Sequence, residues 1–373
     1  MNTIYSWQKE MWRILARDRA SMSHALLLKG RQGIGKFAFG RQLAKSMLCK
    51  NPSIETGEAC QNCPSCGWFE QGSHPDFRLI VPEAMAEKHG SPNAGADEDS
   101  TDVEIGAETE SLSGSAGESG SAKSRKKPSQ QIRILQIRAV TEFINMSSHQ
   151  NGHKIILIYP AETMNHEAAN ALLKNLEEPP PRTLFILVAH RGQYLLPTIR
   201  SRCRQIAMPA PDPATAIAWL KEQGIKNPAK GLASAGYAPL AALEFNDASY
   251  LERHEVFIRQ ISAPGSFNPI ALAEEMQKSD LPTLVNWLQK WCYDLMSFCT
   301  TGKIRYHLDM LATIKSLASE IDPRSLATYL RTLNATQRLA HHPLNSRLFL
   351  EEMLFSYVMS VAPQPLARSR RTD

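Results

Sequence analysis

The sequence contains no apolar run that approaches the length of a membrane-spanning helix. Its first residues, MNTIYSWQKEMW, also lack the apolar core of a secretory signal peptide. The seven cysteines are an odd number, and four of them cluster between Cys49 and Cys66, which suits a metal site better than a disulfide framework. We therefore expect a cytoplasmic protein.

The length and composition predict two or three domains with apolar cores. The chain has 373 residues, of which 43% are hydrophobic. The formal net charge is +5, but residues 90–122 hold eight acids and no Lys or Arg, so the rest of the chain is more basic than this number indicates. A basic surface favours an anionic partner such as nucleic acid, although an ordinary soluble surface gives the same count.

The beginning of the chain has the pattern of a parallel α/β unit. An amphipathic helix is predicted over residues 7–17, and a short apolar strand over residues 25–28. A glycine-rich turn follows, and a helix over residues 36–47 comes directly after it. Strand, glycine loop and helix in this order are typical of a parallel α/β sheet.

Residues 83–130 interrupt this unit. They are rich in glycine, serine and acids, and they end near the basic run at residues 123–127. Such a composition cannot bury enough apolar surface to offset the entropy of ordering the chain, so we predict a disordered insertion.

Regular structure resumes after the insertion. We predict helices over residues 134–146 and 166–178, and strands over residues 154–159 and 183–188. Three prolines at residues 179–181 end the second helix, because proline lacks the amide donor and disfavours helix in its predecessor. Alternating strands and helices again predict a parallel α/β sheet whose ligand edge lies at the strand ends.

Beyond the prolines at residues 209–213, strand signals disappear and helical patterns run to about residue 361. One apolar stripe at helical spacing predicts the buried face of a helical bundle; it consists of Leu284, Leu288, Trp291, Leu295 and Phe298. The basic tail at residues 363–373 is expected to fray.

The glycine-rich turn fits the phosphate-binding pattern G-x-x-x-x-G-K. Its glycines let backbone amides turn toward phosphate oxygens, and Lys36 would reach the outer phosphates. An active P-loop continues with Ser or Thr, whose hydroxyl binds magnesium, whereas this chain has Phe37. The candidate nucleotide-binding residues are Gly30, Gly33, Gly35 and Lys36.

The second half of the ATPase chemistry is also missing. An active enzyme places one or two acids directly after the strand that ends near Ile158, to hold magnesium and polarise the attacking water. This chain has Tyr159 and Pro160 there, and Glu162 would have to reach back from the next turn. We predict that the chain does not hydrolyse ATP, while binding of ATP or ADP at Lys36 stays open.

The cysteine cluster predicts a structural zinc site formed by Cys49, Cys60, Cys63 and Cys66. Two-residue spacing lets thiolates converge on one tetrahedral ion, and four sulfurs leave no open position for catalysis. An iron–sulfur cluster of the bacterial ferredoxin type would need a further cysteine where Glu70 stands. A redox disulfide is a third alternative.

Three segments carry a resemblance to a known family: PAETMN at residues 160–165, AANALLKNLEEPP at residues 168–180, and LPTIRSRC at residues 196–203. With the P-loop and the cysteine cluster, they resemble the clamp-loader branch of the AAA+ proteins. The resemblance extends from the first helix through Cys203, and the helical remainder is similar in kind only.

The resemblance implies three domains and a tail. These are an α/β domain at residues 1–206 with the cysteine module at 49–66, a helical lid at 207–250, and an all-helical collar at 251–362, followed by the tail at 363–373. It also implies a hetero-oligomeric ring with other clamp-loader subunits, which acts on the sliding clamp and primer-template DNA. Such a chain would be a non-catalytic subunit of a bacterial replicative DNA polymerase (nucleotidyltransferase) holoenzyme.

In this family the Ser-Arg-Cys motif supplies an arginine to the ATP site of the neighbouring subunit, and by position that residue is Arg202. A guanidinium placed at a phosphoryl group in trans neutralises developing charge. We expect Arg202 at the end of a strand, with Arg200 close enough to share the role. The alternative is an ordinary surface ion pair. Glu177 and Glu178 end a helix, where the dipole disfavours negative charge, so we expect a partner for them.

Two other functions are weighed against this one. An active clamp-loader ATPase would need the hydroxyl after Lys36 and the acids after Ile158. A zinc-finger DNA-binding regulator would need basic and aromatic residues near the cysteines, but residues 61, 62, 64 and 65 carry no charge.

Overall fold

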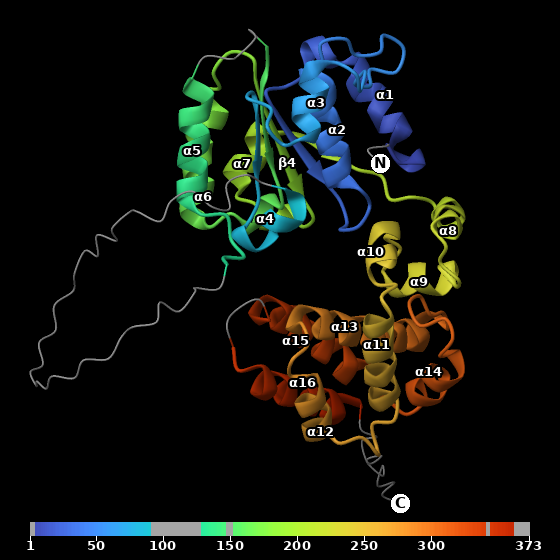
Figure 1. Ribbon diagram of the computed structural model, residues 1–373. Coiled ribbons are helices and arrows are strands. Elements are labelled where there is room, and N and C mark those ends of the chain that lie inside the picture. The colour runs from blue at the N-terminus through green and yellow to red at the C-terminus, as the bar shows by residue number, and fades with distance from the viewer. Residues whose placement is uncertain (1–3, 91–127, 147–151, 341–343, 362–373) are drawn as a thin grey trace, which may run out of the picture. The chain divides into compact units, whose positions relative to one another are not determined.

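The computed structural model describes residues 4–90, 128–146, 152–340 and 344–361 (Figure 1). The chain forms two compact units, Met1–Pro209 and Ala210–Asp373. No helix in these described ranges is long and apolar enough to cross a membrane. The basic tail predicted at residues 363–373 lies outside the described residues.

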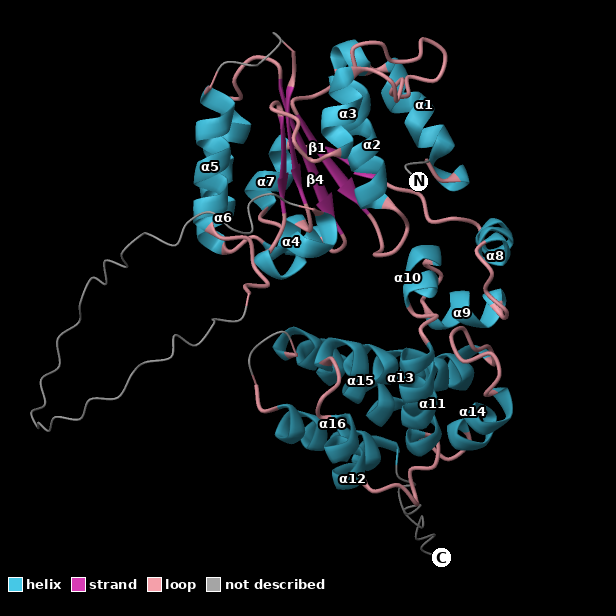
Figure 2. Ribbon diagram, in the orientation of Figure 1, coloured by secondary structure: helices cyan, strands magenta, loops and turns pink. Residues whose placement is uncertain are grey.

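The first unit contains a five-stranded sheet, and every strand pair in it is parallel (Figure 2). The spatial order is β2-β3-β4-β1-β5. The two strands that flank β4, β1 and β3, are apolar except for one lysine at an end of each, and β4 itself is buried along its whole length. Continuous apolar runs are expected of parallel strands that are covered on both faces. The strands are β1 (Ala25–Lys29), β2 (Phe77–Ile80), β3 (Lys154–Ile158), β4 (Thr183–Ala189) and β5 (Arg204–Ala207).

Helices cover both faces of this sheet, as Figure 1 shows. One hydrophobic core packs α1 and α2 against the sheet, and a separate core packs α5, α6 and α7 against it. This architecture confirms the predicted parallel α/β fold. The helices of the unit are α1 (Lys9–Arg17), α2 (Lys36–Leu48), α3 (Pro64–Glu70), α4 (Glu83–His89), α5 (Ile134–Asn145), α6 (His166–Glu177) and α7 (Pro197–Arg202).

The predicted start of the insertion is wrong, because Glu83–His89 forms α4. Glutamate in the first turn and Lys88 and His89 in the last turn complement the helix dipole, and Gly90 ends the helix with a φ of 63°. The acidic, glycine-rich composition begins only after this point. Residues 91–127 lie outside the described residues, so the prediction of disorder there stays a prediction.

The second unit is entirely helical in its described residues. One apolar core forms within α8–α10, and another joins α11–α16. The predicted apolar stripe lies on α13, where four of its five members are buried and the fifth packs against the core. The division into a lid and a collar stays a prediction. The helices are α8 (Pro213–Glu222), α9 (Pro228–Ser234), α10 (Pro239–Glu244), α11 (Ala248–Ile261), α12 (Pro269–Met276), α13 (Leu281–Thr301), α14 (Leu311–Ala318), α15 (Pro323–Leu339) and α16 (Ser346–Val361).

A buried carboxylate on α13 holds the loop that follows this helix. Asp294 is 0% exposed and accepts hydrogen bonds from the backbone N–H groups of Arg305 at 2.8 Å, Tyr306 at 3.0 Å and His307 at 2.8 Å. The His307 ring Nδ1 lies 2.9 Å from the same carboxylate. Burial opposes ionisation of Asp294, but the hydrogen bonds from His307 and Arg305 outweigh it and lower the pKa. The carboxylate therefore replaces the missing backbone partners of this loop.

The loop also contacts α9 and the turn that follows it. Lys230 pairs with Asp309, with 2.7 Å between Nζ and Oδ2. The Tyr237 hydroxyl donates to the Arg305 carbonyl at 3.3 Å, and the Arg305 guanidinium lies over the Tyr237 ring. Asp294 thus fixes a loop that joins two parts of the helical unit.

Candidate functional site

The phosphate-loop motif lies where the sequence predicts it, between β1 and α2. Gly30, Gly33 and Gly35 have φ values of 155°, 76° and 88°. These positive values are readily available only to glycine, so the loop needs these residues. Gly35 precedes the first residue of α2, which is Lys36.

The lysine of this loop points back into its own loop. Lys36 Nζ donates to the carbonyl of Gly30 at 2.7 Å and to the carbonyl of Arg31, and it lies 2.9 Å from Nδ1 of His190. The Lys36 residue is only 2% exposed. An ammonium group has three N–H donors, and these three contacts engage all of them.

The charges around this ammonium are consistent with the hydrogen-bond directions. Burial lowers the pKa of Lys36 to about 8, with Glu162 acting in the opposite direction, so the ammonium form dominates at neutral pH. Burial and the nearby Lys36 charge lower the pKa of His190 to about 3. The His190 imidazole is therefore neutral, and its Nδ1 accepts the hydrogen bond from Lys36.

An aromatic cluster lies beside the phosphate loop. The ring of Phe37 lies 4.6 Å from the Tyr159 ring and 4.6 Å from the His89 ring, measured between centroids. Tyr159 also meets His190 edge to face at 5.5 Å. Phe37, which follows Lys36, and Tyr159, which follows β3, thus contact each other, and neither supplies a carboxylate.

Glu162 has a different role from the one weighed on sequence grounds. Its Oε1 accepts the backbone N–H groups of His190 at 2.8 Å and Arg191 at 3.1 Å. The carboxylate therefore holds the chain where β4 ends, and this is the segment that brings His190 to Lys36. Sequence reasoning placed Glu162 near the site but could not assign it these backbone donors.

The segment before α1 covers the phosphate loop, which the sequence did not predict. Trp7 Nε1 and Gln8 Nε2 both donate to the Ile34 carbonyl, at 3.0 and 2.9 Å. The Tyr5 ring lies so close to Gly35 that a Cβ atom there would be 2.6 Å from it. This part of the loop therefore lies against protein.

Arg202 is the last residue of the short helix α7, and the strand β5 begins only at Arg204. The prediction that Arg202 lies at the end of a strand is therefore wrong. The Arg202 guanidinium pairs with Glu177, the last residue of α6, and its Nη1 donates to the Thr198 carbonyl at 3.0 Å. The Arg202 side chain is 34% exposed. Arg202 is thus the partner that the helix-terminal Glu177 requires.

Arg200 does not share this environment. Its Nε is buried and has no hydrogen-bond partner in the described part of the chain, and its carbonyl accepts from Gln205 Nε2 at 3.1 Å. Of the two arginines that the sequence singled out, Arg202 makes the ion pair with α6.

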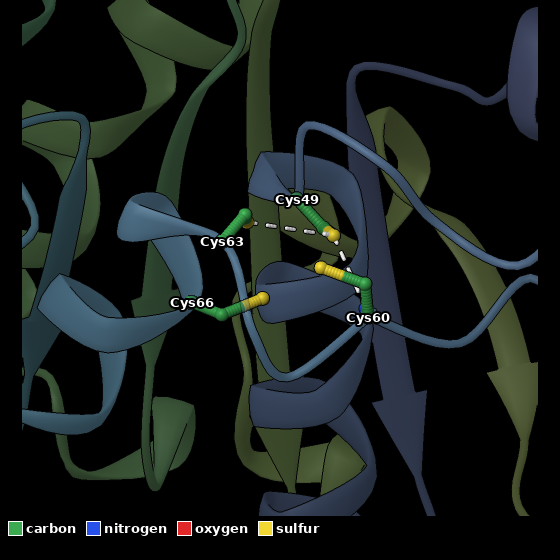
Figure 3. A group of neighbouring side chains, drawn as sticks. All are labelled: Cys49, Cys60, Cys63 and Cys66. Carbon is green, nitrogen blue, oxygen red and sulfur yellow. Dashed lines mark hydrogen bonds between the residues drawn. The ribbon is translucent and has the colours of Figure 1, made fainter.

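The four clustered cysteines converge, as Figure 3 shows. Their sulfur atoms all lie within 4.8 Å of one another, and Cys49 Sγ is 3.9 Å from Cys63 Sγ. A tetrahedral ion with bonds of about 2.3 Å would hold its sulfurs about 3.8 Å apart. All four are free thiols in the structure, so the donor set fits a tetrahedral metal ion.

The local fold turns backbone amides toward these sulfurs. Cys49 follows the end of α2, Cys63 precedes α3, and Cys66 lies within α3. The Cys60 N–H donates to Cys49 Sγ at 3.2 Å. Burial alone would raise the pKa of Cys63, but the N–H groups of Lys50 and Cys66 lower it to about 6. Amide donors of this kind stabilise a thiolate, which is the form that binds metal.

A chain of hydrogen bonds through His74 and Ser65 also holds the cysteine module. The Asp76 N–H donates to His74 Nδ1 at 3.1 Å, which leaves the proton on Nε2. That nitrogen lies 2.9 Å from Ser65 Oγ, and the Ser65 hydroxyl donates to the Leu48 carbonyl at 2.6 Å. Ser65 and Leu48 are the immediate neighbours of Cys66 and Cys49, so these hydrogen bonds fix the backbone beside two of the thiols.

Two protein-family models and several known proteins match this chain. A family model described as "DNA polymerase III, delta subunit" matches residues 7–212, and one described as "DNA polymerase III, delta subunit, C terminal" matches residues 249–357. The "DNA polymerase III subunit delta'" of Pseudomonas aeruginosa is 32% identical to this chain, and the match covers 83% of this chain and 79% of that protein.

Two further relatives carry the same name. The protein from Haemophilus influenzae is 27% identical, over 79% of this chain and 78% of its own length. The protein from Escherichia coli is 26% identical, over 87% of this chain and 86% of its own length. On the strength of the family model and the P. aeruginosa relative, the chain belongs to the DNA polymerase III delta' subunit family.

Proposed function

We propose that this chain is a non-hydrolysing subunit of a clamp-loader ring that places the sliding clamp on primer-template DNA. The observation that carries the proposal is the state of Lys36. Its ammonium is directed at two loop carbonyls and His190, so a phosphate would have to displace all three contacts. With Phe37 and Tyr159 in place of magnesium ligands, a nucleotide that did enter would still lack metal and base.

In this proposal the chain acts on the ATP site of a neighbouring subunit through Arg202. Support comes from the partial exposure of its guanidinium and from its place at the end of a helix. Within the part of the chain that the structure describes, Nη1 and Nη2 each donate to one partner, which leaves further N–H donors of the guanidinium that can face a phosphoryl group. The surface ion pair weighed as the alternative is present, and it is compatible with this role.

The cysteine module would hold one structural zinc ion through Cys49, Cys60, Cys63 and Cys66. The sulfur separations and the amide donors support this ion. When bound, zinc would cross-link the end of α2 to α3 and to the loop between them. No step of ATP hydrolysis needs it.

The remaining proposals, on the domains, the partners and the location of the chain, follow from its proposed place in a clamp-loader ring. The helices of residues 207–250 would form the lid and those of residues 251–362 the collar that joins other clamp-loader subunits. Contact with the clamp and with DNA would come through the complex, in the cytoplasm. The two separate apolar cores of the helical unit support this division.

The isolated chain provides the first test. Calorimetric titration with ATP and ADP in the presence of magnesium should show no binding, and a turnover assay should show no hydrolysis above that of the Lys36→Ala variant. Turnover that disappears in Lys36→Ala would instead establish an active ATPase. Tight sequence-specific binding of DNA by the lone chain would support the zinc-finger regulator.

The assembled complex provides the second test. ATP hydrolysis and clamp loading should depend on this chain, and Arg202→Ala should reduce hydrolysis at the neighbouring site by up to about a thousandfold. Arg204→Ala is the matched control, because this arginine lies two residues away and pairs with Asp18 at 3.0 Å. Full ATPase and loading rates in Arg202→Ala would contradict the proposal.

A further inference from the structure

We propose that Glu177 is a positioning residue for Arg202, which holds the guanidinium ready for the neighbouring ATP site. This inference rests on the proposed role of Arg202 in trans. It concerns the acid at the end of α6, and it predicts that ATP hydrolysis in the complex depends on this acid.

The two side chains meet at the ends of two helices that are close in space but distant in sequence. Glu177 is the last residue of α6, and Arg202 is the last residue of α7. Glu177 Oε1 pairs with Nη2 of Arg202, while Nη1 donates to the Thr198 carbonyl at 3.0 Å. The guanidinium is therefore held from two directions, by the acid on α6 and by a carbonyl of its own helix.

Both anchor points are rigid because their neighbours belong to one apolar core. Leu176, which precedes Glu177, is 1% exposed, and Cys203, which follows Arg202, is 7% exposed. Ile199 of α7 is fully buried in the same core. The backbone positions of the acid and the arginine are thus fixed relative to each other, and only the side chains remain to be ordered.

Stability alone does not explain the pair. Exposed ion pairs contribute little to folding, and the Glu177 and Arg202 side chains are 48% and 34% exposed. A glutamate at the C-terminal end of a helix also opposes the helix dipole. What the pair does achieve is to restrict a long, flexible arginine side chain before it meets a phosphoryl group. Fixing a group in its reactive geometry in advance is a general source of rate enhancement.

The neighbouring acid Glu178 makes a matched control. It follows Glu177 directly and is exposed, and no ion pair is recorded for it within the described part of the chain. Loss of Glu178 removes the same charge from the same helix end without touching Arg202. An effect of the local negative charge alone would therefore be shared by both acids.

The test measures kcat and KM for ATP in the assembled clamp-loader complex. The complex contains either the wild-type chain or one of five variants: Glu177→Ala, Glu177→Gln, Glu178→Ala, Arg202→Ala and the double variant Glu177→Ala/Arg202→Ala. We expect Glu177→Ala to lower kcat by about tenfold to a hundredfold with little change in KM. Glu177→Gln should recover part of the rate, because its amide oxygen still accepts from the guanidinium. Glu178→Ala should match the wild type, and the double variant should match Arg202→Ala.

The outcomes separate this inference from the function on which it rests. If Arg202→Ala has no effect, the role of Arg202 in trans is wrong. If Arg202→Ala impairs hydrolysis but Glu177→Ala does not, only the positioning role is overturned. A faster rate in Glu177→Ala would mean that the acid masks the arginine, which also overturns positioning. Gel filtration of each complex shows whether the variant chain still assembles. If Glu177→Ala does not assemble, Glu177→Gln still tests the positioning role.

Discussion

Replacement of Asp294 by alanine should open the loop that follows α13. In the wild type the carboxylate is fully buried and accepts three backbone N–H groups and a ring N–H of His307. Alanine removes the acceptor and leaves these donors without a partner. Each hydrogen bond to a charged group contributes about 1.5–3 kcal/mol, and some of this is recovered when water enters the opened loop.

We therefore expect Asp294→Ala to lower the free energy of unfolding of the helical unit by about 3–5 kcal/mol, since each buried donor left without a partner costs about 1–3 kcal/mol and water satisfies some of them. Asp294→Asn should cost less, about 2 kcal/mol, because its amide keeps one carbonyl acceptor. A matched control on the same helix is Asp280→Ala. That residue is exposed and accepts from the Thr283 N–H at 3.1 Å as a helix cap, so its loss should cost about 1 kcal/mol.

Hydrogen exchange measured by mass spectrometry gives a local readout. Peptides that contain residues 303–310 should exchange about a hundredfold or more faster in Asp294→Ala, in keeping with a tenfold change for every 1.4 kcal/mol. The same peptides should be unchanged in Asp280→Ala. Equal protection of residues 303–310 in wild type and Asp294→Ala would refute the claim that the carboxylate holds this loop.

The pH dependence provides a further check with a definite sign. Because the pKa of Asp294 is lowered in the folded chain, the carboxylate stabilises the fold fully above the pKa of an unfolded aspartate, about 3.9. This contribution is lost as the pH falls through the lowered pKa. The difference in unfolding free energy between wild type and Asp294→Asn should therefore shrink as the pH falls below about 4. A difference that grows as the pH falls below about 4 would contradict the assignment.

Three further predictions concern the α/β unit. Phe37→Thr should not give the isolated chain ATPase activity, measured as phosphate release, because Tyr159 still leaves the site without a carboxylate; turnover in this variant would be contrary to expectation. Cys66→Ser should lower the zinc content of purified protein, measured by elemental analysis, and the resistance of this unit to urea; full zinc content, or iron with visible absorbance, would overturn the zinc assignment. Gly35→Ala should destabilise the phosphate loop by about 1–3 kcal/mol, since φ is 88° there and the new methyl group would meet the Tyr5 ring at 2.6 Å. An unchanged melting temperature in Gly35→Ala would show that the loop and the segment around Tyr5 separate freely.

Much of the α/β fold could be predicted from local patterns. The apolar runs of β1, β3 and β4 and the glycine-to-lysine loop were found because strands buried on both faces and P-loops have strong local signatures. The short strand β5 and the helix α4 were missed. Three of the four residues of β5 are exposed, which weakens its apolar signal. Helix α4 lies beside the acidic, glycine-rich segment, whose composition masks the helical pattern.

The sequence by itself determined what the phosphate loop lacks. The absence of a hydroxyl after Lys36 and of acids after Ile158 is decided by residue identity, and no folding can supply those groups. The spacing of the cysteines was equally informative, because two-residue intervals bring thiols together through local turns.

Only the tertiary structure decided which groups face one another. His190 reaches Lys36 across 154 residues of sequence, Arg202 reaches Glu177 from the next helix, and Asp294 meets a loop beyond the end of its own helix. Helix and strand signals are local and periodic, so sequence can reveal them. Pairings between segments depend instead on how the sheet and helices pack, and packing has no local signature.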